Sequence, residues 1–266
     1  MKRLMIVFLF IASAASAADY SDLYIIPIAG HTRGAFGTEW RSDVVLHNIQ
    51  QVPITVEMVL VESGLAPSTP PIDIAIATNL TPGETRTLSD ILGTQGRDLT
   101  GALIVGAELP FALTSRTYAE HASGRTLGQT VTPVAITDSS TEVSVLAGLS
   151  DSNHQRSNLG LFLAASHAPM IAEIQLVSST GATLESMLIT VEEPGFTHLQ
   201  FVITSGTTAV VRIVEGDGIA VPYASTVDNI TAEALFVSGE LISSVTNAAA
   251  TMQSLRLRSL GPVARH

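Results

Sequence analysis

Residues 54–62 read ITVEMVLVE, and this stretch decides the class of fold. Ile54, Val56, Met58 and Leu60 occupy every second position, so in an extended chain their side chains share one face. A helix would spread the same residues around its surface, because its side chains repeat about every 3.6 residues. The stretch therefore predicts a β-strand with one face in a hydrophobic core.

Other alternating or β-branched runs follow along the chain, and turn-forming residues separate them. The runs cover residues 72–77, 111–118, 184–191 and 208–214. Strands that are this short and this often interrupted favour a β-sandwich or barrel over alternating strands and helices. Only residues 239–253 look helical, and weakly, because Ser, Thr and Asn are frequent there. The turn signals are the Pro-Pro, Pro-Gly and Gly-Asp-Gly pairs and triplets at 70–71, 82–83, 194–195 and 216–218.

The sequence repeats itself once. Five short matches occur in the same order in both halves, at offsets that drift from 118 to 110 residues. A duplicated module that has lost a few loop residues produces this kind of series. The matches join 28–31 with 146–149, 41–43 with 156–158, 52–57 with 168–173, 82–83 with 194–195 and 110–115 with 220–225.

We therefore predict an all-β protein made of two tandem immunoglobulin-like antiparallel β-sandwiches. Each copy spans about 110 residues, close to the roughly 100 residues of one such sandwich. The first module is expected over 18–138 and the second over 139–238, with the boundary in the polar stretch 137–141. Residues 239–266 are expected to form a weakly helical or flexible extension.

The N-terminus has the features of a secretory signal peptide. Lys2 and Arg3 precede an apolar run over 4–14, and small residues occupy 15–17. This predicts a signal peptide over 1–17 and export to the periplasm or the outside of the cell. The run is shorter than the about 20 residues of a membrane-spanning helix, and no later segment is long and apolar enough to span a membrane.

Charge and cysteine content narrow the function further. The net charge is −11, and taking away Lys2 and Arg3 leaves about −13. A surface this acidic repels phosphate backbones, so nucleic acid is not an expected partner. The chain has no cysteine, so packing and hydrogen bonds alone must hold the exported protein together.

Several motifs resemble those of a known group of proteins. Trp40 to Asn48 fits W-R-[ST]-D-V-x-L-x-N, Pro82 to Thr85 fits P-G-x-T, and Pro110 to Tyr118 fits P-x-x-x-x-S-R-T-Y, with a further match at Gly124 to Gln129. In these motifs the chain resembles exported proteins of environmental bacteria that contain tandem β-sandwich modules. The strand pattern of each half is also loosely similar to the β-sandwich of the sensory rhodopsin transducer family. No activity is assigned to the exported group, so the resemblance implies a fold and a compartment only.

The sequence contains no motif that predicts catalysis, a cofactor or a metal site. The G-x-S-x-G nucleophile motif, the H-E-x-x-H zinc motif and the D-x-D-x-D-G calcium loop are all absent. Glu192 and Glu193 are adjacent acids, but they precede Pro194-Gly195 and are expected in a solvated turn.

Arginine and acidic residues form one constellation in the first copy. Arg41 and Asp43 are two positions apart on a predicted strand and therefore share a face. Arg116 lies at a similar level, and its planar guanidinium can bind a carboxylate with two hydrogen bonds. We predict that Arg116 pairs with Asp43 as a structural bridge; a ligand-binding arginine is the alternative.

The second copy has related residues at shifted positions. Arg156 takes the place of Arg41, Asn158 that of Asp43 and Thr226 that of Arg116, and a new acid appears at Asp228. By the same reasoning, we predict that Arg156 pairs with Asp228.

Trp40 is the only tryptophan, and it follows the glycine-rich stretch 30–38. It could fill the end of a sandwich or form an aromatic platform on an exposed loop. Both positions remain open at this point.

These features favour a non-enzymatic exported protein for binding or surface structure, acting through sandwich loops or strand edges. Its partner would be a protein, a glycan or a component of the extracellular matrix. The alternative is an extracellular hydrolase in a groove between the modules, with convergent acids or a Ser/His pair near His31, Asp151, His154 and Arg156. A third possibility is an assembly subunit with an open sheet edge in one module.

Overall fold

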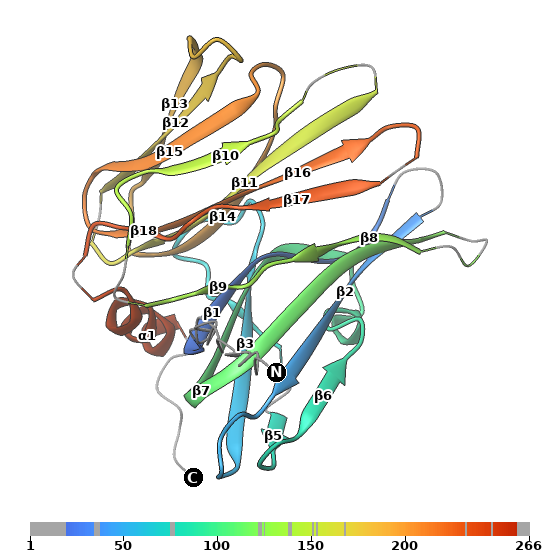
Figure 1. Ribbon diagram of the computed structural model, residues 1–266. Helices are drawn as coiled ribbons and strands as arrows, with labels where there is room; N and C mark the ends of the chain where they lie inside the picture. The colour runs from blue at the N-terminus through green and yellow to red at the C-terminus, as the bar shows by residue number, and fades with distance from the viewer. Residues whose placement is uncertain are drawn as a thin grey trace, which may run out of the picture.

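The computed structural model of the chain is almost entirely antiparallel β-sheet (Figure 1). It describes residues 20–34, 38–74, 78–121, 124, 126–137, 140–150, 152, 154–167, 169–231, 233–245 and 247–259, so the predicted signal peptide lies outside the described residues. The elements are β1 (Ser21–Arg33), β2 (Thr38–His47), β3 (Ile54–Glu62), β4 (Ile72–Asp73), β5 (Thr78–Leu80), β6 (Thr85–Leu88), a 3-10 turn (Gly93–Gln95), β7 (Leu99–His121), β8 (Thr126–Val131), β9 (Val134–Ala135), β10 (Ser144–Ala147), β11 (Gln155–Ala165), β12 (Met170–Val177), β13 (Thr183–Val191), β14 (Gly195–Val202), β15 (Thr208–Glu215), β16 (Gly218–Asp228), β17 (Ala234–Ser238), β18 (Ile242–Ser243) and α1 (Ala248–Ser259).

The strands up to β9 form the first sandwich. One of its sheets has the order β4-β3-β7-β1, and the other has the order β6-β2-β7-β8. The 23-residue strand β7 belongs to both sheets. Its first part pairs with β1 and β3, and its second part pairs with β2 and β8.

The strands from β10 onward form the second sandwich, which has the same topology. Its sheets have the orders β13-β12-β15-β10 and β14-β11-β16-β17. Here β15 and β16 correspond to the two parts of β7, and a turn with Gly216 at φ 82° separates them. The predicted fold class, two tandem antiparallel sandwiches of the immunoglobulin-like class, is confirmed.

Matching hydrogen bonds show that the two copies also share their register. Ser42 lies opposite Thr117 with their hydroxyl oxygens 2.8 Å apart, and Ser157 lies opposite Thr226 with theirs 2.7 Å apart. The Ser42 carbonyl accepts a hydrogen bond from the backbone N–H of Ile91, and the Ser157 carbonyl accepts one from Ile203. In chain order these pairs align the copies at offsets of about 115, 112 and 109 residues, which fall along the chain in the same direction as the offsets of the sequence repeat.

The buried apolar side chains form three clusters rather than two. One cluster fills each sandwich. The third lies between the sandwiches, because β1, β3, β7, β11 and β16 bury side chains on both faces. Its members are Leu23, Ile25, Val59, Val61, Ala102, Ile104 and Ile136 of the first sandwich, Phe162, Ala164, Phe196, Ile219 and Val221 of the second, and Leu241, Ala248, Met252 and Leu255 of the C-terminal segment.

The C-terminal segment differs from the extension that the sequence predicts. β18 pairs with β16, and the helix runs over Ala248–Ser259 instead of 239–253. Leu241, Met252 and Leu255 are buried in the third cluster, which α1 covers beside both sandwiches (Figure 1). The sequence predicted only a weak helix here because of the Ser, Thr and Asn content, but burial of one apolar face outweighs weak helix propensity.

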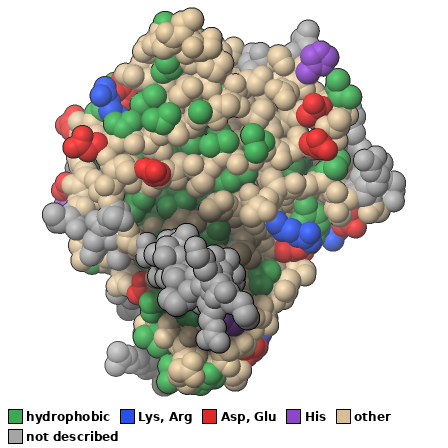
Figure 2. Space-filling view, viewed as in Figure 1, with side chains coloured by type: hydrophobic (Ala, Val, Ile, Leu, Met, Phe, Trp, Pro, Cys, Tyr) green, Lys and Arg blue, Asp and Glu red, His purple; other side chains and the backbone are tan. Residues whose placement is uncertain are grey.

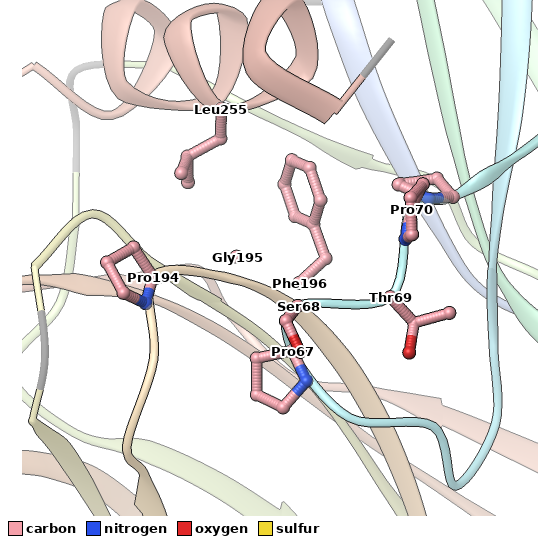
Figure 3. Close-up of a pocket in the computed structure, with 9 residues that line it drawn as sticks. Pro67, Ser68, Thr69, Pro70, Pro194, Gly195, Phe196 and Leu255 are labelled. Carbon is pink, nitrogen blue, oxygen red and sulfur yellow. The ribbon is translucent and has the colours of Figure 1, made fainter. Parts of the chain in front are cut away.

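A small hollow lies between α1 and the loop that follows β3 (Figure 3). It has a volume of about 190 Å³, and Pro67, Pro70, Pro194, Phe196 and Leu255 contribute to its walls. In the close-up, the Phe196 ring lies between the loop and the helix. The hollow is thus the outer end of the third cluster. No helix among the described residues is long and apolar enough to span a membrane.

We expect the two sandwiches to unfold together, because the third cluster joins them. Phe162 is fully buried in this cluster and stacks on Phe196 at a ring distance of 6.0 Å. Phe162→Ala should cost about 3–5 kcal/mol of unfolding free energy. Urea denaturation followed by Trp40 fluorescence, which reports on the first sandwich, should show this loss in full.

Ile230→Ala is the control for this experiment, since Ile230 is highly exposed and its loss should change stability by less than about 0.5 kcal/mol. An unchanged Trp40 transition in the Phe162 variant, with a separate transition by circular dichroism, would contradict the coupling.

Candidate functional site

A groove opens between the sandwiches where the third cluster ends. Side chains two positions apart on β11 show the change: Phe162 is in the cluster, Gly160 follows, and Asn158 and Arg156 line the groove. On β14, Phe196 is likewise followed by His198 and Gln200. The interface between the sandwiches is therefore apolar at one end, and at the other end it has polar as well as apolar side chains.

The groove has a volume of about 240 Å³. Amide and hydroxyl side chains dominate its polar lining, and among the lining residues Arg156 is the only one that carries a charge. The walls comprise Ile28, Ala29, Gly30, Thr32, Trp40, Thr100, Thr117 and Gln129 of the first sandwich and Arg156, Asn158, Gln200, Tyr223, Ser225 and Val227 of the second.

Tyr223 forms part of the base of the groove, and Gly160 makes room for it. A Cβ atom at Gly160 would lie 1.9 Å from the Tyr223 ring, so only glycine fits opposite this tyrosine. The ring stacks between His198, at 5.8 Å, and Phe236, at 5.7 Å. Burial raises the pKa of Tyr223, so its hydroxyl keeps its proton and can donate a hydrogen bond.

His198 connects the two sandwiches beneath the groove. Its Nδ1 atom lies 2.7 Å from Ser63 Oγ, and its Nε2 atom lies 3.0 Å from the hydroxyl oxygen of Tyr223. The backbone N–H of Gly64 also donates to the His198 carbonyl over 2.8 Å. Burial lowers the pKa of His198 to about 4, so the imidazole is neutral at physiological pH.

The Ser63–His198 pair bears directly on the hydrolase alternative, which predicts a Ser/His pair at this junction. In catalytic triads a carboxylate orients the histidine, whereas here the second ring nitrogen contacts Tyr223. A general base works best with a pKa near the working pH, and a pKa near 4 makes His198 a weak base. The arrangement suits hydrogen bonding better than proton transfer.

The more exposed part of the groove, its mouth, combines an aromatic ring, an amide and a cation, which belong to Trp40, Gln129 and Arg156. Trp40 lies on β2, on the same strand face as Ser42 and Val44, at the open end of the first sandwich and partly exposed. It is therefore a strand residue at a sandwich end, and not a residue of an exposed loop. Gln129 Oε1 accepts a hydrogen bond from Ser225 Oγ across the junction, over 3.1 Å.

The predicted pair in the first copy is present. Arg116 Nε and Nη2 donate to Asp43 Oδ2 over 2.9 and 2.7 Å, because the two residues lie directly opposite each other on β7 and β2. Asp43 Oδ1 accepts a hydrogen bond from the backbone N–H of Asp90 over 2.9 Å. Arg41 interacts with Glu39 at 2.8 Å and Glu120 at 3.3 Å. These contacts lie on the outer face of the first sandwich and support a structural role.

The predicted pair in the second copy is wrong. Arg156 lies opposite Val227, whereas Asp228 lies opposite Gln155, so the two side chains point to opposite faces of the sheet. Arg156 instead donates to the side chain of Asn229, and Asp228 accepts backbone hydrogen bonds from Ile230 and Thr231. The match between the two copies that the sequence suggested, Thr226 with Arg116, is wrong by one residue. In the structure Thr226 corresponds to Thr117, and Ser225 corresponds to Arg116.

The residues named for the hydrolase alternative are not gathered in the groove. His31 Nδ1 lies 2.8 Å from Asp90 Oδ1 in the first sandwich, and His154 does not line the groove. Asp151 lies outside the described residues. Only Arg156 of this set lines the groove. The described part of the chain holds no cluster of three His, Asp or Glu residues that could bind a metal.

Sequence reasoning missed Ser63, His198, Gln200 and Tyr223. Their signal was weak, because Phe196, His198 and Gln200 form an alternating face with both apolar and polar members. Burial of that face depends on contact with the other sandwich, which no periodicity reports.

Comparison with known proteins adds little to this geometry. No protein-family model and no curated protein matches the chain. Among solved structures, a putative β-galactosidase from Bacteroides fragilis matches 81% of this chain with 9% identity and a TM-score of 0.20. A glycosyl hydrolase family 2 member from Bacteroides cellulosilyticus matches 76% with 11% identity and a TM-score of 0.18. The chain covers 32% and 28% of these proteins, and similarities this low assign no activity to it.

We expect the Arg116–Asp43 pair to stabilise the first sandwich measurably. The Asp43 side chain is 8% exposed, so Arg116→Met would leave its carboxylate largely buried without its cation. The Arg116 side chain is 58% exposed, which reduces the expected loss to about 1–2 kcal/mol in urea denaturation. Arg33→Met is the control, because this exposed pair with Asp98 should contribute less than about 0.5 kcal/mol. Equal effects of the two variants would show that Arg116 adds nothing beyond a surface pair.

We also expect His198 to make stability depend on pH. The folded pKa of about 4 lies below the ordinary value of 6.5, so the unfolded chain binds a proton that the folded chain excludes. The contribution of the neutral His198 to the free energy of unfolding is complete above about pH 6.5. It falls by about 1.4 kcal/mol per pH unit as the pH drops toward 4. Between about pH 7.5 and pH 5, wild type should therefore lose roughly 2 kcal/mol more than His198→Gln.

The measurement is urea denaturation of both proteins at both pH values. The carboxylates present in both proteins contribute equally to the pH dependence, so their contribution drops out of the difference. His47→Gln, at a partly exposed histidine outside the junction, should keep the wild-type dependence. The same pH dependence in His198→Gln and wild type would refute the burial of a neutral imidazole.

Proposed function

We propose that this chain is an exported, non-enzymatic binding protein that holds a hydroxyl-rich ligand, the end of a glycan chain, in the groove between its sandwiches. One observation supports this above all: beside apolar residues such as Ile28 and Val227, the polar lining of the groove consists of neutral amides and hydroxyls and one arginine, with a tryptophan and no carboxylate among the lining residues. Sugar hydroxyls both donate and accept hydrogen bonds, and amide and hydroxyl side chains match them in both roles.

The size and shape of the groove fit a short ligand. A volume of about 240 Å³ is below the roughly 300–1,000 Å³ of pockets for drug-sized ligands, so it suits about one sugar unit. Trp40 offers a single aromatic face at the mouth, which can pack on the apolar side of a sugar ring. Arg156 would favour a sugar that carries a carboxylate.

The charge of the protein is compatible with such a partner. The net charge of −11 disfavours polyanions as a class, and Figure 2 shows Asp and Glu side chains scattered over the visible face. A single arginine inside a neutral groove can still select a locally anionic group. Export, which the N-terminal sequence predicts, would bring the groove into contact with glycans outside the cytoplasm.

The test is calorimetric titration of the mature protein with neutral and uronic acid-containing oligosaccharides. Trp40→Ala should weaken binding about tenfold or more, and Arg156→Gln should weaken acidic ligands more than neutral ones. Arg212→Gln is the control, since Arg212 pairs with Glu173 away from the groove and should leave binding unchanged. Failure of every oligosaccharide class to bind would contradict the proposal.

The Ser63–His198 pair keeps one second candidate, an esterase-type hydrolase, open to test. We expect no hydrolysis of an activated aryl ester above background, because His198 is a weak base without a carboxylate partner. Turnover by wild type that Ser63→Ala abolishes would favour the hydrolase instead.

A further inference from the structure

The second sandwich leaves one long sheet edge open, at β13. The corresponding edge of the first sandwich consists of two short strands, β4 with two residues and β5 with three. β13 has nine residues, and its pairing with β12 runs from Val191 to Thr183. In the described part of the chain the sheet order ends at β13, so its outer backbone groups have no strand beside them.

The other edges of this sandwich are covered or short. The segment that follows β3 contacts β14 at two residues, because the backbone N–H of Gly64 donates to the His198 carbonyl and the Thr197 hydroxyl donates to the Leu65 carbonyl. β17 lies beside β8 of the first sandwich. β10 has only four residues. Among the described edge strands of the second sandwich, β13 is therefore the one long strand whose outer side is open.

β13 has few of the features that usually protect an edge. Its pairing with β12 is regular from Val191 to Glu185, and one irregularity lies at Leu184, near the end of the strand. Proteins block open edges with proline, lysine, bulges or very short strands. Residues 183–191 read TLESMLITV, with no proline, lysine or glycine, and Glu185 is the only charged residue. Leu184 and Leu188 are 52% and 64% exposed. A strand of this composition is suited to pairing with another strand.

We propose that β13 pairs antiparallel with β13 of a second copy of this chain, which joins two four-stranded sheets into one continuous sheet. A two-fold axis perpendicular to the sheet keeps even-numbered side chains of both copies on the same face. With the axis at Ser186, Leu184 lies opposite the partner's Leu188, and Glu185 lies opposite the partner's Met187.

The side chains of β13 complement themselves in this register. Each exposed leucine covers another leucine, at the short distance of directly opposed residues. The two Glu185 carboxylates are not opposed, so the contact avoids the like-charge pair that would destabilise it. This self-complementarity argues for a second copy over a foreign strand.

This interface is independent of the proposed ligand groove. The groove is built on the sheet of β14, β11 and β16, whereas β13 is the edge of the other sheet of the second sandwich. Dimerisation would leave the groove free.

The absence of cysteine gives a sharp test. Ser186→Cys places the single thiol of each copy opposite its own partner on the axis, where a disulfide can form. Mild oxidation of the full mature protein should yield a covalent dimer. Thr190→Cys is the matched control on the same strand face; its two copies would lie eight residues apart, roughly 27 Å, and should not cross-link.

A second variant tests the association without a cross-link. Sedimentation velocity over a wide concentration range should show reversible dimers of the wild type, and Leu188→Lys should lower the association constant at least tenfold. Leu188 is exposed, so this change should leave the unfolding transition of the monomer in place. A wild type that stays monomeric throughout, or a dimer that persists in Leu188→Lys without cross-linking at Ser186→Cys, would overturn the proposal.

Discussion

The third hydrophobic cluster is the constraint on which the rest of this structure depends. Two sandwiches, each with its own core, present apolar side chains on the outer faces of adjoining sheets, and helix α1 adds Met252 and Leu255 to the same cluster. Burial of apolar area is favourable wherever it occurs, so two folded modules with apolar outer faces must join. The duplicated modules therefore behave as a fused pair with a fixed relative position.

That fixed position is what creates a site. A groove between flexibly linked domains would change shape with every domain motion, whereas this groove continues directly from a packed interface. His198 holds the junction from below through Ser63 of one sandwich and Tyr223 of the other. The polar lining residues are thus positioned by a rigid scaffold, and little ordering entropy is left to lose when a ligand binds.

Period-two patterns predicted much of the fold and little of the site. The alternation over 54–62 placed Ile54, Val56, Met58 and Leu60 in the first core, where they lie. Val59 and Val61 face the third cluster, which the uninterrupted apolar run 58–61 could have indicated. The Arg116–Asp43 pair followed from spacing, whereas its counterpart failed because a one-residue error in register moves a side chain to the other face.

The divergence of the two copies explains why one face became a groove. Asp43 and Arg116 correspond to Asn158 and Ser225, which lie directly opposite each other on β11 and β16. In the first copy the Arg116 side chain on this face is 58% exposed, so the pair keeps part of its hydration although Asp43 is largely buried. In the second copy it faces the other sandwich, where desolvation would make the same pair costly. Neutral amide and hydroxyl groups can be half-buried there and still bind a ligand, so the loss of the ion pair and the gain of the groove are one change.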